Sequence, residues 1–205
     1  MSGPARLLAP TELAEIVERL AAEISADHPG GVVLVGVLKG SVVLVADLLR
    51  RLSVPVEVDF LSLSSYAAGA RRVQVLKDLD LDVSGREVVL VQDVVDTGLS
   101  ARYVLDLLAG HGARRARLCA LFDRPGRRII PLELDYRGVE APDRYLVGYG
   151  LDLAERFRNL PDVVAVGGPG SPGPGLGLDL PGLDLPGFDL PDLDLLARDL
   201  YGPAG

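Results

Sequence analysis

Strand-like apolar runs that alternate with helical patterns are the feature that most restricts how this chain can fold. The runs occupy residues 32–37, 56–63, 88–95 and 115–122. Short apolar runs of this kind are typical of strands that are covered on both faces of a sheet. Helix-like segments at 41–52 and 100–112 lie between them. This order predicts an α/β fold, with an open, mainly parallel twisted sheet that is flanked by helices and connected by right-handed crossovers.

A further amphipathic helix is expected before the first run. Its apolar face holds Leu13, Ile16, Val17, Leu20 and Ile24. Thr11 is the expected N-cap, because a threonine hydroxyl can accept a hydrogen bond from the first turn, and the helix should end at DHPGG. His28 in that turn and His111 between two glycines are read as helix-end residues rather than as catalytic or metal-binding groups.

Length and composition describe a globular protein of one domain, or of one domain with an appendage. The chain has 205 residues, of which 48% are hydrophobic and 24% charged, and it has no apolar run of 18 residues. The N-terminus lacks the long apolar segment of a signal peptide, so we expect a soluble, cytoplasmic protein without a membrane partner. The single cysteine, Cys119, excludes a disulfide framework and a thiolate metal site, and we expect it in the core.

The net charge of -8 argues against a nucleic-acid partner that is bound through a basic surface. Much of the charge is local. From Gly167 onward there are six Asp and one Arg, a net -5, which leaves -3 for residues 1–166. The body of the protein is therefore nearly balanced.

A Gly/Pro linker and an acidic five-residue repeat, GLDLP, set residues 167–205 apart from the domain at 1–166. Proline at every fifth position forbids a continuous helix, so we expect a disordered or loosely extended tail. A repeat expansion without a function is the simpler explanation. The alternative is that its Leu/Phe stripe docks on the body or on a partner.

Residues 64–85 form a long connection of mixed character. Its middle, with Gly69, Arg71 and Arg72, predicts a mobile surface loop or a hairpin tip. Loops of this length in a compact domain are often lids.

The strand-loop-helix transition QDVVDTGLSA at 92–101 carries the strongest functional signal. A loop that opens a helix presents unpaired backbone N–H groups, and the helix N-terminus favours an anion. Gly98 permits a close approach to the backbone, while Thr97 and Ser100 add hydroxyl donors. The pattern predicts a phosphate cradle. The loop carries neither GxxxxGK[ST] nor GxGxxG, so the common triphosphate and dinucleotide interpretations lack support.

Asp93 and Asp96 lie beside this predicted cradle. Carboxylates would repel a phosphate unless they accept protons from hydroxyl groups, hold a metal ion or act as a base. A sugar phosphate is therefore the ligand that the residues favour.

VVLVQDVVDTGLS at 88–100 is similar to the 5-phosphoribosyl-1-pyrophosphate (PRPP) signature of the type I phosphoribosyltransferases, and its surroundings resemble the hypoxanthine-guanine branch. The further matching segments, in family order, are residues 35–52, 59–66, 77–100, 121–128 and 138–166. The resemblance implies the type I phosphoribosyltransferase fold, with a flexible lid and a small base-binding hood. It implies purine salvage, in which hypoxanthine, and guanine as a second base, react with PRPP to give IMP or GMP and pyrophosphate.

By this resemblance, Asp96 accepts or stabilises the proton at N7 of the purine. Residues Thr97, Gly98, Leu99 and Ser100 would hold the 5′-phosphate, and Gln92 and Asp93 would face the ribose. Leu38, Lys39 and Gly40 correspond to the pyrophosphate loop, and Arg158 to an arginine that contacts pyrophosphate. Ser65 and Tyr66 match the serine-tyrosine pair of the lid.

The resemblance also implies a purine pocket and an Mg²⁺ cofactor. Arg124 stands where the family has a lysine that binds the 6-oxo group, Tyr145 where an aromatic ring stacks on the base, and Leu146 where a carbonyl meets the 2-position. Asp152, with Asp93, would hold the metal. As structural alternatives, Tyr145 and Leu146 are core strand residues and Arg158 lies on a solvated helix face. Relatives in the family are commonly homodimers or homotetramers.

Two positions depart from the family pattern. Gln92 replaces a glutamate, which removes one negative charge, and Arg124 replaces a lysine, which changes reach and geometry. Two other functions stay open: a non-catalytic sensor of PRPP or nucleotides, and a phosphoribosyltransferase that prefers xanthine.

Overall fold

The computed structural model describes residues 5–63 and 74–167. Its main sheet has six strands in the order β4-β3-β2-β5-β6-β7. These are β2 (Val32–Val37), β3 (Val56–Leu63), β4 (Val75–Lys77), β5 (Glu87–Val95), β6 (Arg115–Asp123) and β7 (Tyr136–Glu140). All neighbours are parallel except the edge strand β4, which is antiparallel to β3. The predicted mainly parallel α/β sheet is confirmed.

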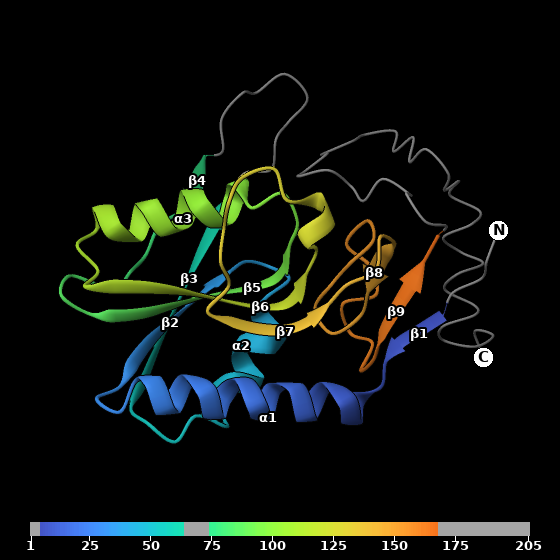
Figure 1. Ribbon diagram of the computed structural model, residues 1–205, viewed down its shortest axis with the longest axis horizontal. Helices are drawn as coiled ribbons and strands as arrows, with labels where there is room; N and C mark the ends of the chain where they lie inside the picture. The colour runs from blue at the N-terminus through green and yellow to red at the C-terminus, as the bar shows by residue number, and fades with distance from the viewer. Residues whose placement is uncertain (1–4, 64–73, 168–205) are drawn as a thin grey trace.

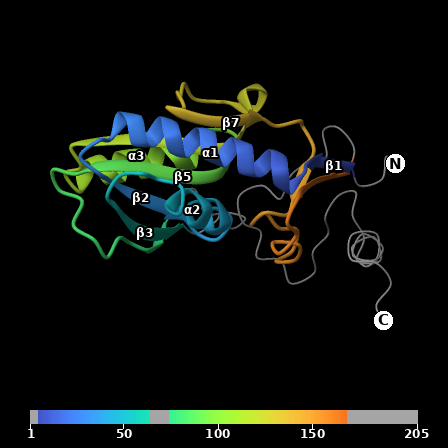
Figure 2. The ribbon, with the colours of Figure 1, turned by 90° about the horizontal axis from the view of Figure 1, so that it is seen from below.

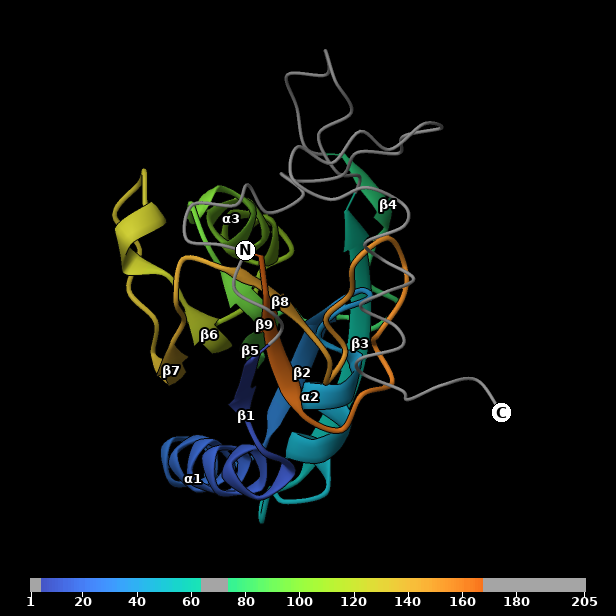
Figure 3. The same cartoon turned by 90° about the vertical axis from the view of Figure 1, so that its right-hand side faces the viewer.

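Helices cover both faces of this sheet (Figures 1 and 3). The helices α1 (Pro10–Asp27) and α2 (Val42–Leu49) lie on one face, and α3 (Leu99–Gly110) lies on the other. Seen from below, α1 runs along the sheet (Figure 2). Its buried residues, Leu13, Val17, Leu20, Ala21 and Ile24, form the apolar stripe that packs there.

The central strand β5 contributes side chains to the hydrophobic cores on both faces of the sheet. Val89 and Val91 belong to the cluster under α1 and α2, whereas Val88 and Leu90 belong to the cluster under α3. Successive side chains of a strand point to opposite faces, so a strand that is covered on both sides is apolar at consecutive positions, as residues 88–91 are here. Cys119 on β6 pairs with Val91 and is fully buried, as predicted.

The boundaries of two predicted helices needed correction. Thr11 is not the N-cap of α1, because the helix begins at Pro10 and Ala9 is the cap. Proline suits this first position since its missing N–H would be unsatisfied anyway, and the Ala9 N–H donates to the Glu12 carboxylate at 2.7 Å. The helix predicted to reach residue 52 ends at Leu49. His28 and His111 do lie at helix ends, as the C-caps of α1 and α3.

A second, smaller sheet lies beyond the carboxyl ends of the main strands (Figures 1 and 3). It contains β1 (Ala5–Leu8), β9 (Val163–Val166) and β8 (Tyr145–Val147), in that order and antiparallel. We call this sheet, together with residues 148–162, the hood. The alternation of apolar runs did not predict these short strands, nor β7, but the family resemblance implied a hood of this kind.

Several predictions fall outside the described residues. These are the lid residues Ser65 and Tyr66, with the glycine and arginines of the same connection, and the repeat tail after Gly167. The described flanks of the connection, β3 and β4, pair antiparallel, with Ser62 opposite Lys77. No helix in the described part of the chain is both long and apolar enough to cross a membrane.

Candidate active site

The candidate site lies where three parallel strands end side by side. β2 ends at Val37, β5 at Val95 and β6 at Asp123. The loops that follow carry residues 38–41, 96–98 and 124–128, and the hood lies next to this edge (Figure 3). In open α/β sheets the ligand binds outside the carboxyl ends of the strands.

Gln92 and Asp93 belong to the last part of β5 itself. Gln92 is buried, at 6% exposure, beside its partner Ala120 on β6. The Asp93 carboxylate accepts a hydrogen bond from the Val94 N–H at 2.9 Å. Desolvation raises the pKa of Asp93, and the nearby negative charge of Asp152 adds to that, while Arg158 opposes it. The hood therefore brings Asp152 and Arg158 within electrostatic reach of Asp93.

Gly40 fixes how closely the loop after β2 approaches Asp93. A Cβ on Gly40 would lie 1.7 Å from the Asp93 Oδ2, so the carboxylate would have to move. A Cβ on Gly150 of the hood would likewise meet the Gly40 carbonyl oxygen at 2.3 Å, and Gly150 has φ +95°. Glycines at both positions thus let the loop after β2, the end of β5 and the hood come together around the Asp93 carboxylate. The adjoining Leu38–Lys39 peptide is cis.

The loop that is predicted to hold a phosphate leads directly into α3. Gly98 is the N-cap of α3 in the left-handed conformation, with φ +87°. The Leu99 N–H reaches the Thr97 hydroxyl at 3.4 Å, so the hydroxyl already lies beside the helix start. Leu99 and Ser100 begin the helix and are partly accessible, and they leave the first N–H groups of α3 at the site edge.

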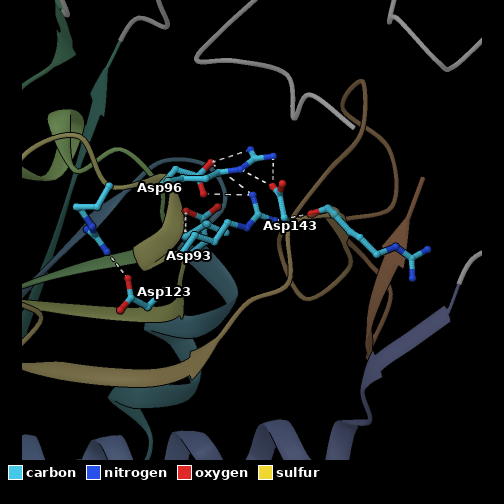
Figure 4. Close-up of polar contacts among 9 residues, drawn as sticks. Asp93, Asp96, Asp123 and Asp143 are labelled. Carbon is cyan, nitrogen blue, oxygen red and sulfur yellow. Dashed lines mark hydrogen bonds and ion pairs between the residues drawn. The ribbon is translucent and has the colours of Figure 1, made fainter. Parts of the chain in front are cut away.

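Asp96 follows β5 directly and contacts two guanidinium groups (Figure 4). Arg124 Nη1 lies 3.2 Å and 3.4 Å from its two carboxylate oxygens, and Arg127 Nη1 lies 3.9 Å away. Arg127 is itself held by Asp143, whose carboxylate accepts from Nε at 2.6 Å. The Asp96 side chain is 39% exposed, so it stays open to a ligand from the solvent side.

Arg124 begins the loop after β6 and is buried, at 7% exposure. Its backbone N–H donates to the Val95 carbonyl, and its Nη2 donates to the Arg144 carbonyl at 2.6 Å, next to the hood strand β8. The guanidinium therefore connects the end of β5 with the hood. Arg124 Nε is buried and has no hydrogen-bond partner within the described residues.

The hood loop contributes a charged cluster on the other side of the site. Arg158 donates from Nη1 to the Gly150 carbonyl at 2.8 Å and from Nη2 to Asp152 at 2.8 Å and Glu155 at 3.3 Å. Glu155 also pairs with Lys39 at 3.0 Å. Lys39 and Arg158 are thereby linked through one carboxylate. Arg158 does not lie on a helix, so the alternative of a solvated helix face is wrong.

Tyr145 and Leu146 lie in β8 and are buried, at 9% and 4% exposure. Tyr145 packs with Phe157 and Val166 in the core of the hood. Burial raises its pKa, the negative charge of Asp152 adds to this, and Arg124 opposes it. Tyr145 and Leu146 are therefore buried strand residues, as the structural alternative expected. Their proposed contacts with a purine base stay a prediction.

The structure brings together nearly all of the predicted site residues that it describes. Asp93, Gly40, Asp152 and Arg158 gather on one side, and Asp96 and Arg124 on the other. Sequence reasoning missed Glu155, Arg127 and Asp143, which contact these groups. Their spacing gave a signal for two of them: Arg127 follows Arg124 by one turn, and Glu155 lies three residues from both Asp152 and Arg158.

Comparisons with known proteins agree with this geometry. Residues 5–154 match the family model of the phosphoribosyl transferase domain. A hypoxanthine-guanine phosphoribosyltransferase of Streptococcus agalactiae is 40% identical over 150 residues, which are 71% of this chain and 83% of that protein. One of Bacillus subtilis is 36% identical over 159 residues, which are 76% and 88% of the two chains.

Two further relatives extend the comparison. A crystal structure of a hypoxanthine-guanine phosphoribosyltransferase from Bacillus anthracis superposes with a TM-score of 0.77 at 38% identity, and the match covers 79% of this chain and 98% of that one. A bifunctional protein TilS/HprT of Listeria innocua is 40% identical, and there the chain spans 24% of the relative's length. The chain therefore belongs to the phosphoribosyltransferase family, in its hypoxanthine-guanine branch.

Proposed function

We propose that the chain transfers the 5-phosphoribosyl group of PRPP to hypoxanthine, and to guanine as a second base, and releases IMP or GMP and pyrophosphate. The observation that carries the proposal is the pair Asp93 and Asp96, which flank the end of a buried strand directly before the N-terminus of α3. Carboxylates for the ribose and the base thus lie beside donors for the phosphate. Two relatives that are named hypoxanthine-guanine phosphoribosyltransferase match the chain over 83% and 88% of their own length.

Each end of the substrate has a suitable group in this proposal. The 5′-phosphate binds the N–H groups and hydroxyls of residues 97–100, where the helix dipole favours an anion. Asp93 accepts hydrogen bonds from ribose hydroxyls, and the neighbouring Gln92 amide offers an uncharged acceptor. The diphosphate meets Lys39 and Arg158, whose charges suit its oxygens.

The purine would lie between the loop after β6 and the hood. Arg124, whose guanidinium lies between Asp96 and the hood, would donate to the 6-oxo group, and the Tyr145 ring and the Leu146 carbonyl would border the base. In the reaction, a ring nitrogen bonds to C1 of the ribose while the bond from C1 to the diphosphate oxygen breaks. Asp96 receives or stabilises the proton at N7. Charge develops on the sugar and on the leaving group, so electrostatic stabilisation and water exclusion do most of the catalysis.

Asp93 and Asp152 fit a magnesium ion. The raised pKa of Asp93, to which Asp152 contributes, marks two carboxylates that would gain from a shared cation. Among the described residues no three His, Cys, Asp or Glu side chains cluster as a complete metal site. Mg²⁺ is commonly bound by one or two carboxylates plus substrate phosphates and water, so this partial set suits an ion that arrives with the diphosphate. Such an ion would neutralise the leaving group.

The test is turnover by the purified full chain with Mg²⁺ and PRPP, with hypoxanthine, guanine, xanthine and adenine offered separately and nucleotide formation followed by absorbance. We expect IMP and GMP to form. Turnover of xanthine alone would change the base specificity, and PRPP binding without turnover of any base would instead indicate a sensor.

Asp96→Asn should lower kcat by about 10² or more, since general acid-base catalysis contributes on that order. The amide cannot accept the proton from the purine. Asp106→Asn on the exposed face of α3 is the matched control and should keep wild-type kcat. A kcat for Asp96→Asn that equals that of the control would remove Asp96 from this role.

Gly40→Ala should reduce kcat/KM for PRPP by about 10² because the added Cβ displaces the Asp93 carboxylate, and a misplacement of about 1 Å can cost that much. Gly30→Ala is the control, since nothing lies within 4 Å of a Cβ there. If both variants keep wild-type kcat/KM, the close approach of Gly40 to Asp93 has no part in catalysis.

Gln92→Glu should lower the KM for PRPP when Mg²⁺ is present, because it restores a negative charge beside the proposed metal and ribose. The comparison is made in steady-state kinetics at saturating base. An unchanged KM would show that the charge at this position does not affect PRPP binding.

A further inference from the structure

Glu155 places a carboxylate between the two cations that the proposed function assigns to the diphosphate. Its Oε2 lies 3.0 Å from Lys39 Nζ and 3.3 Å from Arg158 Nη2. The same oxygen therefore accepts from both groups, as a phosphate oxygen would.

The backbone holds Glu155 there in an unfavourable conformation. Leu153 and Arg156 exchange N–H to carbonyl hydrogen bonds of 3.1 Å in both directions, which makes residues 153–156 a two-residue turn. Its central residues, Ala154 and Glu155, have φ of +52° and +63°. Turns with positive φ at both central positions favour glycine and asparagine. Ala154 and Glu155 are neither glycine nor asparagine. Left-handed conformations of other residues concentrate at functional sites.

Neighbouring contacts set the direction of the carboxylate. The Glu155 N–H donates to Asp152 Oδ2 at 2.8 Å, so the turn is bound to the proposed metal residue. Arg158 is bound to Asp152 and to the Gly150 carbonyl. These two contacts hold the Arg158 guanidinium in place beside the Glu155 carboxylate.

We infer that Glu155 is an internal stand-in for the diphosphate, which keeps Lys39 and Arg158 assembled in the free chain and must be displaced when PRPP binds. This inference rests on the proposed function, because it takes Lys39 and Arg158 as diphosphate ligands. Glu155 is thus a residue that sets affinity for diphosphate ligands, and the substrate competes with it for the same two cations.

Displacement has a modest cost. The side chains of Lys39 and Glu155 are each 65% exposed, and exposed ion pairs contribute little because water and salt screen them. Glu155→Gln keeps the shape and the strained backbone but removes the competing charge. It should bind pyrophosphate and PRPP, each with Mg²⁺, about three- to tenfold more tightly in isothermal titration calorimetry, and it should lower the KM for PRPP by a similar factor. The gain should shrink in 0.5 M salt, to about twofold or less, as the pairs are screened.

A matched control separates a general effect of removing a surface charge from the effect at this site. Glu23→Gln, which breaks an exposed pair with Arg19 on α1, should not differ from the wild type. The inference is overturned if Glu155→Gln binds pyrophosphate and PRPP no more tightly than the wild type does. It is also overturned if the gain in affinity is the same at high salt. In that case wild-type turnover with PRPP would still stand, whereas a wild type that neither binds PRPP nor turns over defeats the proposed function itself.

Discussion

The burial of β5 on both faces is the constraint on which the site depends. Its apolar side chains supply the cores under α1 and α3 alternately, and its neighbours β2 and β6 hydrogen-bond it on both sides. A strand that is held in this way has little freedom, so Asp93 and Asp96 leave the sheet in fixed directions. The loops after β2 and β6 end at the same edge, and glycines let them approach closely. The rigid end of β5 and the glycines in the loops around it thus position the carboxylates of the site.

Internal ion pairs fill the site in the free chain. Arg124 and Arg127 contact Asp96, and Lys39 and Arg158 contact Glu155. The pairs of Asp96 join neighbouring strand-end loops, the Lys39–Glu155 pair joins the loop after β2 to the hood, and the Arg158–Glu155 pair lies within the hood. Under the proposed function, a ligand with a diphosphate and a polar base would exchange these contacts for its own. Binding would then replace one set of charge partners with another, which would limit the cost of gathering like charges in one place.

The parallel sheet, its four main strands and the helices between them could be predicted from apolar periodicity, because strands buried on both faces have few alternatives. The hood strands could not: β1, β8 and β9 are three or four residues each, and they pair residues that are far apart in the chain, such as Ala5 and Ala165. Site residues on β5 were predicted from local chemistry, whereas Lys39, Asp152 and Arg158 were identified through family resemblance. Glu155 was missed because its role depends on a turn with positive φ, which Ala and Glu do not signal.

A crystal structure of the full chain with IMP bound would test these assignments directly. We expect the 5′-phosphate on the N–H groups of residues 97–100, the ribose hydroxyls on Asp93, and the purine beside Asp96, Arg124 and Tyr145. A nucleotide with its phosphate away from the start of α3, or with its base out of reach of Asp96, would contradict them.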